Sequence, residues 1–270
     1  MIRLTFSLAS DVGCLRHNNE DMILLNGELF RDEQNSGSFY MTRESRFEAC
    51  VADGMGGHEG GEFASELATQ FFDDFLTDLQ PGLTSQLLIG HVRQWAVTTH
   101  QRIVDKSLQL PQYTGMGTTF VGLFSYEDKV FSVNIGDSRL YRFRKGILRQ
   151  LSTDHSVASV TGDSNIPTNV IYNSLGAGNN AFADVEDISD RIMPDDTYLI
   201  CSDGLSDMLS DTDIEQILTQ TNTKTHTDSA QPSANPSTAA SIANRLIEAA
   251  KQAGGKDNIS AILLTFCPDA

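Results

Sequence analysis

The sequence predicts an α+β fold in which antiparallel sheet and helices occupy separate stretches of one domain. Two helical patterns follow each other directly between about residues 60 and 110, and several short, strand-like apolar runs lie close together after them. Strands that alternated singly with helices would instead predict parallel βαβ units. The 270 residues, of which 40% are hydrophobic, can build a large core that needs no disulfide or metal in order to fold.

The strands are predicted from short apolar runs. At the start of the chain Leu4, Phe6 and Leu8 alternate with polar residues, as in a strand that is buried on one face. Six further runs have the length and the apolar content of strands. They span residues 47–52, 118–124, 130–135, 140–143, 197–202 and 259–266.

The first helix is predicted from apolar residues at every fourth position, which gather on one side of a helix. They form a stripe that should face the core, made of Phe63, Leu67, Phe71, Phe75 and Leu79. A second helix is expected over about residues 83–110. A third, which is rich in alanine, is expected over about residues 237–253 and ends at a Gly-Gly pair that suits a helix stop.

Residues 222–238 are rich in Thr, Ser and Pro and show no periodicity. Such a composition buries little apolar surface, so it predicts a mobile surface insertion. Because only one helix and one strand are expected after it, this segment is an insertion within a single domain that spans residues 1–270, and not a linker between two domains.

The charge and composition exclude several classes of protein. The chain carries 19 basic and 36 acidic residues, a net charge of −17, whereas nucleic-acid and anionic-membrane binders need a basic face. No apolar run approaches the roughly 18–20 residues that cross a bilayer, and the N-terminus lacks a secretory signal. The four cysteines lie far apart without a CxxC pair, which predicts buried free thiols and a cytoplasmic location.

Carboxylates beside glycine recur where predicted strands end. Asp53 follows the run FEACVA and Asp203 follows YLICS, so each leaves a buried strand for a turn in which a glycine allows close approach. Similar groups occur at residues 19–21, 136–139 and 256–258. A single Asp-Gly pair would indicate only a turn. Five such groups on one chain suggest that they share a site.

Such a site would need cations. Carboxylates brought together without them repel one another, which raises their pKa values. Oxygen ligands without a cluster of His or Cys favour Mg²⁺ or Mn²⁺ over zinc. The sequence contains no GxxxxGK[ST], HExxH or GxSxG motif, so it gives no sign of a P-loop, a zinc protease or a serine hydrolase.

Seven motifs in fixed order carry a resemblance to a known family. They are RHNNED (16–21), DGMGGH (53–58), MGTT (116–119), NIGDSR (134–139), DHS (154–156), SDGLSD (202–207) and KDNI (256–259). The chain resembles the metal-dependent protein phosphatases of the PPM, or type 2C, family over about residues 5–266. The resemblance implies an α-β-β-α sandwich, two stacked antiparallel sheets flanked by helices. The form DGMGGHEGGEFAS is similar to the bacterial branch of that family.

The resemblance also implies roles for individual carboxylates. Asp53 would bridge two metal ions, and the carbonyl of Gly54 would bind the second of them. Asp203 and Asp257 would complete the site of the first ion. Asp137 would help to hold a weaker third ion, as in bacterial-type members.

Further roles implied by the resemblance concern waters and substrate. Glu20 and Asp21 would hold metal-bound waters, and Arg16 would bind phosphate oxygens with its planar, two-pronged guanidinium. A water that bridges two metal ions would lose a proton easily and attack phosphorus in line. Many eukaryotic members carry His, a candidate general acid, where this chain has Met55. Methionine cannot donate a proton.

These roles predict an enzyme: a protein-serine/threonine phosphatase that uses two or three Mn²⁺ or Mg²⁺ ions. Its partners would be phosphorylated protein substrates and a cognate bacterial Ser/Thr kinase, which it would oppose. Two alternatives remain open. One is a non-catalytic regulatory module on the same fold, in which metal ligands are usually lost, and the other is a phosphatase for small phosphate esters. Residues 157–174, where the family has a flap beside the active site, are few and Asn-rich, so substrate preference stays open.

Overall fold

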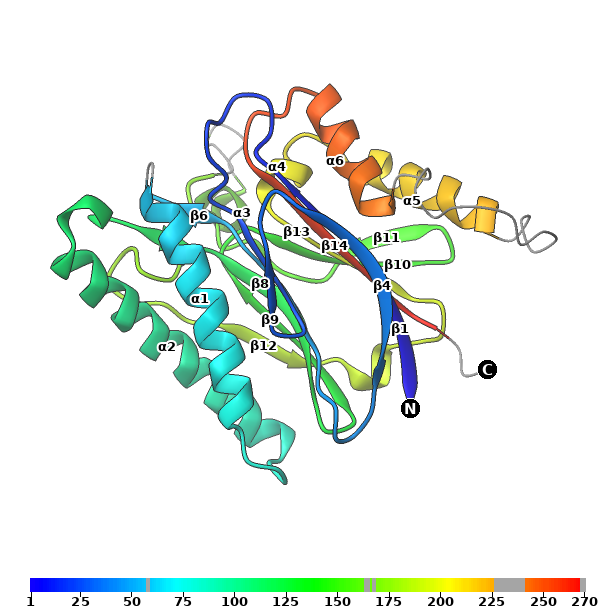
Figure 1. The fold of residues 1–270 in the computed structure, drawn as a ribbon, viewed down its shortest axis with the longest axis horizontal. Coiled ribbons are helices and arrows are strands. Elements are labelled where there is room, and N and C mark those ends of the chain that lie inside the picture. The colour runs from blue at the N-terminus through cyan, green and yellow to red at the C-terminus, as the bar shows by residue number, and fades with distance from the viewer. Residues whose placement is uncertain (57–58, 163–165, 167–168, 226–240, 268–270) are drawn as a thin grey trace.

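The computed structural model describes residues 1–56, 59–162, 166, 169–225 and 241–267. Two six-stranded sheets pack face to face (Figure 1). The first consists of β1 (Ile2–Asp11), β4 (Gln34–Met41), β10 (Arg139–Arg144), β11 (Ile147–Gln150), β13 (Thr197–Cys201) and β14 (Ile259–Phe266). The second consists of β2 (Met22–Leu25), β3 (Glu28–Phe30), β5 (Glu48–Ala52), β8 (Phe120–Tyr126), β9 (Lys129–Ile135) and β12 (Asp184–Asp187).

Neighbouring strands are antiparallel in both sheets. Their order is β11-β10-β13-β14-β1-β4 in the first sheet and β12-β9-β8-β5-β2-β3 in the second. Two further strands of two residues each, β6 (Gly54–Met55) and β7 (Gly117–Thr118), pair with each other. The predicted antiparallel α+β architecture is confirmed.

Helices cover the outer face of each sheet (Figure 1). The second sheet is covered by α1 (Glu59–Asp78) and α2 (Ser85–Gln109), and the first by α4 (Asp203–Ser206), α5 (Asp211–Thr225) and α6 (Ile242–Gln252). The short helices α3 (Val157–Thr161), η1 (Pro111–Tyr113) and η2 (Ser189–Arg191) lie in connections. Apolar side chains fill the space between the sheets and the space under each helical layer. The result is the four-layered α-β-β-α sandwich.

The seven strands expected from apolar runs are present, with shifts of a few residues at their ends and with the run 118–124 divided between β7 and β8. Six other strands were missed, namely β2, β3, β4, β6, β11 and β12. Two of these, β4 and β12, are polar and lie at sheet edges. Because an edge strand is partly exposed to water, its sequence needs no regular pattern of apolar residues. The helix α5 was also missed.

The packed face of α1 differs from the predicted stripe. Its most deeply buried residues include Ala64, Ala68, Phe72 and Leu76, whereas of the predicted stripe only Leu67 is buried and the other four residues are partly buried. A helix turns once in 3.6 residues, so a repeat of four drifts around its axis. The two alanines let the helix approach the sheet, and the larger side chains pack on either side of that contact.

The other helices are close to their predicted ranges. The N-cap of α2 is Thr84, whose hydroxyl accepts the N–H of Leu87 at 3.3 Å, so the helix begins two residues later than expected. α6 begins after its N-cap Ser241, and the start predicted at 237 lies outside the described residues.

The predicted insertion begins too early, because residues 222–225 are the last residues of α5. The rest of it, residues 226–238, lies outside the described part of the chain. The four cysteines are free thiols, and Cys50 and Cys201 are buried as expected. The expectation of burial is wrong for Cys14, which is exposed on the loop after β1, and Cys267 is only partly buried. None of the helices in the described residues is long and apolar enough to cross a bilayer.

Candidate active site

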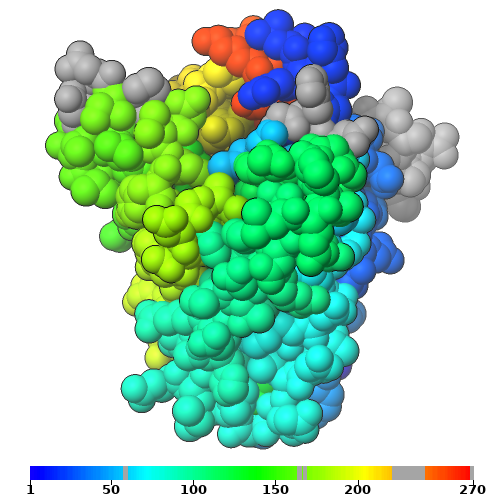
Figure 2. Space-filling model, turned by 90° about the vertical axis from the view of Figure 1, so that its left-hand side faces the viewer, coloured from blue at the N-terminus to red at the C-terminus, as the bar shows by residue number. Residues whose placement is uncertain are grey.

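Chain segments from both sheets meet around one pocket of about 420 Å³. It lies at the end of the sandwich where β5, β9 and β13 finish. Figure 2 shows that end at the top, with the loop after β1 in blue beside the orange-red segment that precedes β14. Seven of the eight predicted site residues line the pocket: Arg16, Glu20, Asp53, Gly54, Asp137, Asp203 and Asp257. The eighth, Asp21, is buried and does not line it.

Asp53 is the first residue after β5, and its backbone is fixed on both sides. Its N–H donates to the hydroxyl of Thr119 at 3.0 Å, and its carbonyl accepts the N–H of Thr119 at 2.9 Å. The next residue, Gly54, donates its N–H to the carbonyl of Glu20 at 3.2 Å. A Cβ atom on Gly54 would overlap the carbonyls of Gly61 and Glu20, so only glycine fits there.

Asp203 opens the short helix α4, directly after β13. A Cβ on Gly204 would overlap the carbonyl of Asn258, which shows how closely this turn packs on the segment that carries Asp257. Asn258 in turn organises the neighbouring loop. Its side-chain oxygen accepts the N–H of Glu20 at 2.8 Å, and its side-chain nitrogen donates to the carbonyl of Asn18 at 3.0 Å.

Asp21 lies beneath the pocket. Its Oδ2 accepts the hydroxyl of Ser202 at 2.7 Å, while its buried Oδ1 has no hydrogen-bond partner among the described residues. Its backbone carbonyl accepts Nε of Arg31 at 3.0 Å, and the same guanidinium bonds Oε1 of Glu62 at 2.7 Å. The start of α1 therefore holds the loop that carries Glu20 and Asp21.

Asp137 occupies the turn between β9 and β10 and is 9% exposed. Its neighbour Ser138 shares a hydrogen bond of 2.7 Å with Thr119, the residue that also fixes Asp53. On the other side of this turn, the N–H of Gly136 donates to Nδ1 of His155 at 3.1 Å.

Arg16 lies on the loop after β1, and its side chain is 53% exposed. Its Nη2 donates to Oδ2 of Asp257 at 2.7 Å, and this bond raises the pKa of Arg16. The guanidinium has further N–H groups that this contact does not use. The arrangement places a forked cation at the rim of an acidic pocket.

The carboxyl groups of Asp53, Asp137 and Asp203 hold their protons more tightly than isolated ones. Burial, together with the charges of Asp21 and Asp203, raises the pKa of Asp53 well above its usual range. Burial and the charge of Asp203 raise the pKa of Asp137 to about 7. Burial, with the charges of Asp207 and Asp257, raises the pKa of Asp203 to about 6. Cations bound among these groups would lower the pKa values again, because they stabilise the charged form.

The donor set suits a hard divalent cation. The pocket offers carboxylates and a backbone carbonyl, and the buried Oδ1 of Asp21 can still accept a hydrogen bond from a water. Within the described residues no three His, Cys, Asp or Glu side chains are already gathered into one coordination shell. Arg16 instead neutralises Asp257. The residues fit Mg²⁺ or Mn²⁺ in type, and the charge that such ions bring would offset the repulsion among them.

Some residues of the pocket were not singled out from the sequence. Thr119 and Asn258 support Asp53 and Glu20, and both lie inside the motifs MGTT and KDNI, so the motifs were the available signal. His17 and Asn18 line the pocket beside Arg16. Met55 lines it as well, as its place after Gly54 implies.

Comparisons with known proteins agree with this geometry. A family model described as protein phosphatase 2C matches residues 31–248. The chain is 32% identical over 209 residues to a serine/threonine phosphatase, stp, of Listeria monocytogenes, covering 74% of this chain and 77% of that protein.

Two solved structures resemble the whole fold. The S. agalactiae serine/threonine phosphatase superposes with a TM-score of 0.74 at 26% identity, covering 97% of this chain and 99% of that one. The catalytic domain of the phosphatase PstP, solved with two manganese ions, superposes with a TM-score of 0.70 at 28% identity, covering 99% and 100%.

Proposed function

This chain belongs to the protein phosphatase 2C family, and from that premise we propose how its own residues carry out the reaction. It is a metal-dependent protein-serine/threonine phosphatase. We propose that residues 1–270 form a single phosphatase domain and that the pocket bounded by Asp53, Asp137, Asp203 and Asp257 is its active site. The observation that carries the assignment is the convergence of these four carboxylates from both sheets on one pocket.

The carboxylates would hold two Mn²⁺ or Mg²⁺ ions, and Asp137 would help to hold a third, more weakly bound ion. Asp53 would bridge two ions, the carbonyl of Gly54 would bind the second, and Asp203 and Asp257 would complete the first site. Support comes from the oxygen-only donor set and from the two manganese ions in the PstP relative. When bound, such ions supply an acidified water as nucleophile and positive charge opposite the transferring phosphoryl group.

Glu20 and Asp21 would orient the waters around the ions. Glu20 lines the pocket, and its backbone N–H is fixed by the side chain of Asn258. Asp21 is held by Ser202 through one carboxylate oxygen, which leaves the other free to accept a hydrogen bond. Both residues would therefore act on a water and not on the substrate.

Arg16 would bind the phosphate group of the substrate. Its guanidinium lies at the rim of the pocket, and the two prongs match two phosphate oxygens. The pocket is open to solvent at this rim, so a phosphorylated side chain on a protein surface can enter it. Binding here would orient the phosphorus for in-line attack and share the charge that develops on its oxygens.

The natural substrates are phosphorylated proteins, as the named relatives imply. We propose that a cognate Ser/Thr kinase supplies them and that both enzymes act in the cytoplasm. Such a reducing compartment would keep the exposed thiol of Cys14 unoxidised. The alternative of a non-catalytic module is disfavoured because every predicted ligand position keeps its oxygen donor. A preference for small phosphate esters is the remaining alternative.

Metal dependence tests the proposal directly. Protein stripped of metal should turn over p-nitrophenyl phosphate and a phosphothreonine peptide only after Mn²⁺ or Mg²⁺ is added. Ca²⁺ should support little turnover, because it tolerates irregular shells and acidifies water less. Full activity in excess chelator would contradict the metal assignment, and turnover of the aryl ester without the peptide would favour the small-ester alternative.

A further inference from the structure

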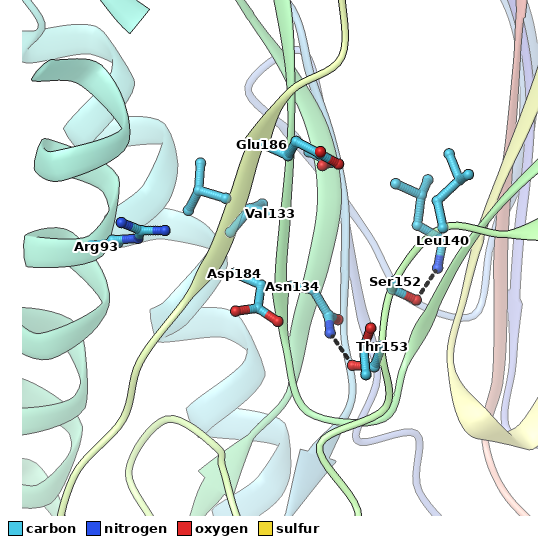
Figure 3. Close-up of a pocket in the computed structure, with 11 residues that line it drawn as sticks. Arg93, Val133, Asn134, Leu140, Ser152, Thr153, Asp184 and Glu186 are labelled. Carbon is cyan, nitrogen blue, oxygen red and sulfur yellow. Dashed lines mark hydrogen bonds between the residues drawn. The ribbon is translucent and has the colours of Figure 1, made fainter. Parts of the chain in front are cut away.

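A second cavity, of about 290 Å³, lies between the two sheets at the edge formed by β12 and β9 (Figure 3). Strands β9 and β12 supply Ser132, Asn134, Asp184 and Glu186, and the facing sheet supplies Leu140 and the segment 151–153. The cavity shares no residue with the lining of the active-site pocket.

The wall formed by β9 and β12 is unusual for the inside of a sandwich because it is polar. The register sets Asp184 opposite Asn134 and Glu186 opposite Ser132, so the four side chains lie on one face. The alternate residues Val133 and Val185 face the helices. The buried residues on the rest of this inner face are mostly apolar, among them Ile23, Val51 and Val121. Burying polar groups between the sheets costs folding free energy unless they form hydrogen bonds.

Asn134 has an unmet hydrogen bond in this cavity. The residue is 5% exposed, and its Nδ2 donates to the carbonyl of Thr153 at 2.8 Å (Figure 3). That bond fixes the orientation of the amide, because a carbonyl can only accept. Its Oδ1 is buried and has no partner among the described residues. The cavity therefore contains a buried hydrogen-bond acceptor, Oδ1 of Asn134, that a bound donor would satisfy.

The other polar groups add acceptors and negative charge. Asp184 accepts Nε2 of His155 at 3.0 Å and Glu186 accepts Nη2 of Arg191 at 2.5 Å, each through one of two carboxylate oxygens. Both side chains remain more than half exposed, at 58% and 53%. Arg93 reaches the rim from α2, on the other side of β12, and is exposed to water (Figure 3).

We propose that this cavity binds a small organic cation that carries N–H donors, a primary ammonium or a guanidinium ion. Its donors would satisfy Oδ1 of Asn134 and bond the second carboxylate oxygens of Asp184 and Glu186, whose first oxygens bond His155 and Arg191. An anion would meet two carboxylates. The inference goes beyond the phosphatase reaction and does not depend on it.

Hydrogen bonds of His155 connect this cavity to the turn that carries Asp137. Asp184 holds Nε2 of His155, and Nδ1 of the same ring accepts the N–H of Gly136, the residue before Asp137. A cation that binds the carboxylate of Asp184 would change the hydrogen bond between this carboxylate and the ring of His155. The amide of Gly136 therefore reports on the cavity.

Agmatine, which carries a guanidinium at one end and an ammonium at the other, is a suitable probe. We expect its titration into the full-length, Mg²⁺-loaded protein to cause saturable NMR shifts at the side-chain amide of Asn134 and at the backbone amides of Asp184 and Gly136. Valerate, a chain of similar length with a negative charge, should cause none. The absence of saturable shifts at millimolar agmatine would overturn the proposal and leave water as the occupant.

Two variants localise the binding. Ser132→Ile fills the cavity with a residue that suits a strand, and it should abolish the shifts while leaving phosphatase activity unchanged. Glu186→Gln removes one charge and should weaken binding about tenfold, the scale of one charge-assisted hydrogen bond. Glu28→Gln, on the opposite edge of the same sheet, is the matched control and should bind like the native protein. If Ser132→Ile fails to fold, Glu186→Gln decides. Unchanged binding in Glu186→Gln would overturn the site.

Discussion

The imidazole of His155 supports the turn that carries Asp137. Its Nδ1 accepts the N–H of Gly136 at 3.1 Å, and the carbonyl of Gly136 accepts the N–H of His155 at 2.9 Å. Asn173 also donates to Nδ1, at 2.7 Å, so the ring proton lies on Nε2 and is donated to Asp184. The ring is 2% exposed. Its tautomer is thus set by its neighbours, and with it the position of the turn.

We expect His155→Ala to weaken metal binding at Asp137 about 10–100-fold, the usual effect of removing a group that orients a ligand. His155→Gln should keep part of the affinity, because its side-chain oxygen can accept the N–H of Gly136. Calorimetric titration with Mn²⁺, alongside thermal unfolding of each variant, measures this. Equal loss of Mn²⁺ affinity and of stability in both variants would indicate a purely structural role.

Asp53→Asn should abolish turnover and leave the fold intact. The amide has the same shape as the carboxyl but cannot bridge two cations with its charge. Since the raised pKa of Asp53 reflects burial and neighbouring carboxylates, the variant without metal should be at least as stable as the native protein above pH 7. Urea unfolding and p-nitrophenyl phosphate turnover in saturating Mn²⁺ test both statements. Near-native turnover would refute the bridging role.

Arg16→Lys should lower kcat/KM by a factor that corresponds to about 1–3 kcal/mol, the scale of a charge-assisted contact. Lysine keeps the charge, and with it the attraction to Asp257, but loses the fork that fits two phosphate oxygens. Steady-state kinetics with a phosphopeptide provide the measurement. An unchanged kcat/KM would mean that Arg16 serves only its salt bridge with Asp257.

Met55→His should raise the turnover of alkyl phosphates relative to aryl phosphates. An alkyl leaving group such as serine needs a proton, whereas an aryl oxide leaves readily as an anion. Among the described residues His17 is the histidine that lines the pocket, so His17→Gln should shift the same ratio in the opposite direction. The ratio of kcat values for the two ester types, followed across pH, reports on both. If neither variant moves it, proton donation to the leaving oxygen is not limiting.

Glu48→Gln should stabilise the protein at alkaline pH. Burial raises the pKa of Glu48 to about 7 from 4.5, so the folded state binds its proton more tightly than the unfolded chain does. The free energy of unfolding therefore falls as pH rises from about 4.5 to 7. Glutamine can still accept the N–H of Gly27, which bonds Oε1 of Glu48 at 2.5 Å.

We expect Glu48→Gln to match the native protein near pH 4 and to exceed it by up to about 3 kcal/mol at pH 8, since one pKa unit is worth ~1.4 kcal/mol. Urea denaturation at the two pH values measures the difference. A constant difference across this range would show that Glu48 does not titrate with an elevated pKa.

The sequence predicted the position of site residues best where a carboxylate directly follows a buried strand. Asp53 and Asp203 follow strands that are buried along their whole length and mostly apolar, and such strands are predictable because both faces are buried. The order of the motifs then identified the remaining pocket residues. Pattern alone could not give the phase of α1, which depends on Ala64 and Ala68 contacting the sheet, and alanine marks no face in a sequence.

Contacts between segments that lie far apart in the sequence could not be predicted either. Arg31 fixes the carbonyl of Asp21 and bonds Glu62 on α1, yet no short motif contains both partners. The polar edge strand β12 was missed for a related reason. Its sequence, DVED, resembles a loop, and its hydrogen bonds to β9 are what make it a strand. The polar cavity beside it could not be foreseen without that pairing.

The carboxylates of the proposed active site border strands of two different sheets. Asp53 and Asp137 follow strands of the second sheet, whereas Asp203 and Asp257 border strands of the first. Ions held between them would join the two sheets at one end, much as a disulfide joins two segments, and this joint would be reversible. Amide hydrogen exchange at the ends of β5 and β13 should then slow as Mn²⁺ is added, following the logarithm of its concentration. The supply of free divalent metal would thereby govern how often this end of the sandwich opens, as well as how fast phosphate is released.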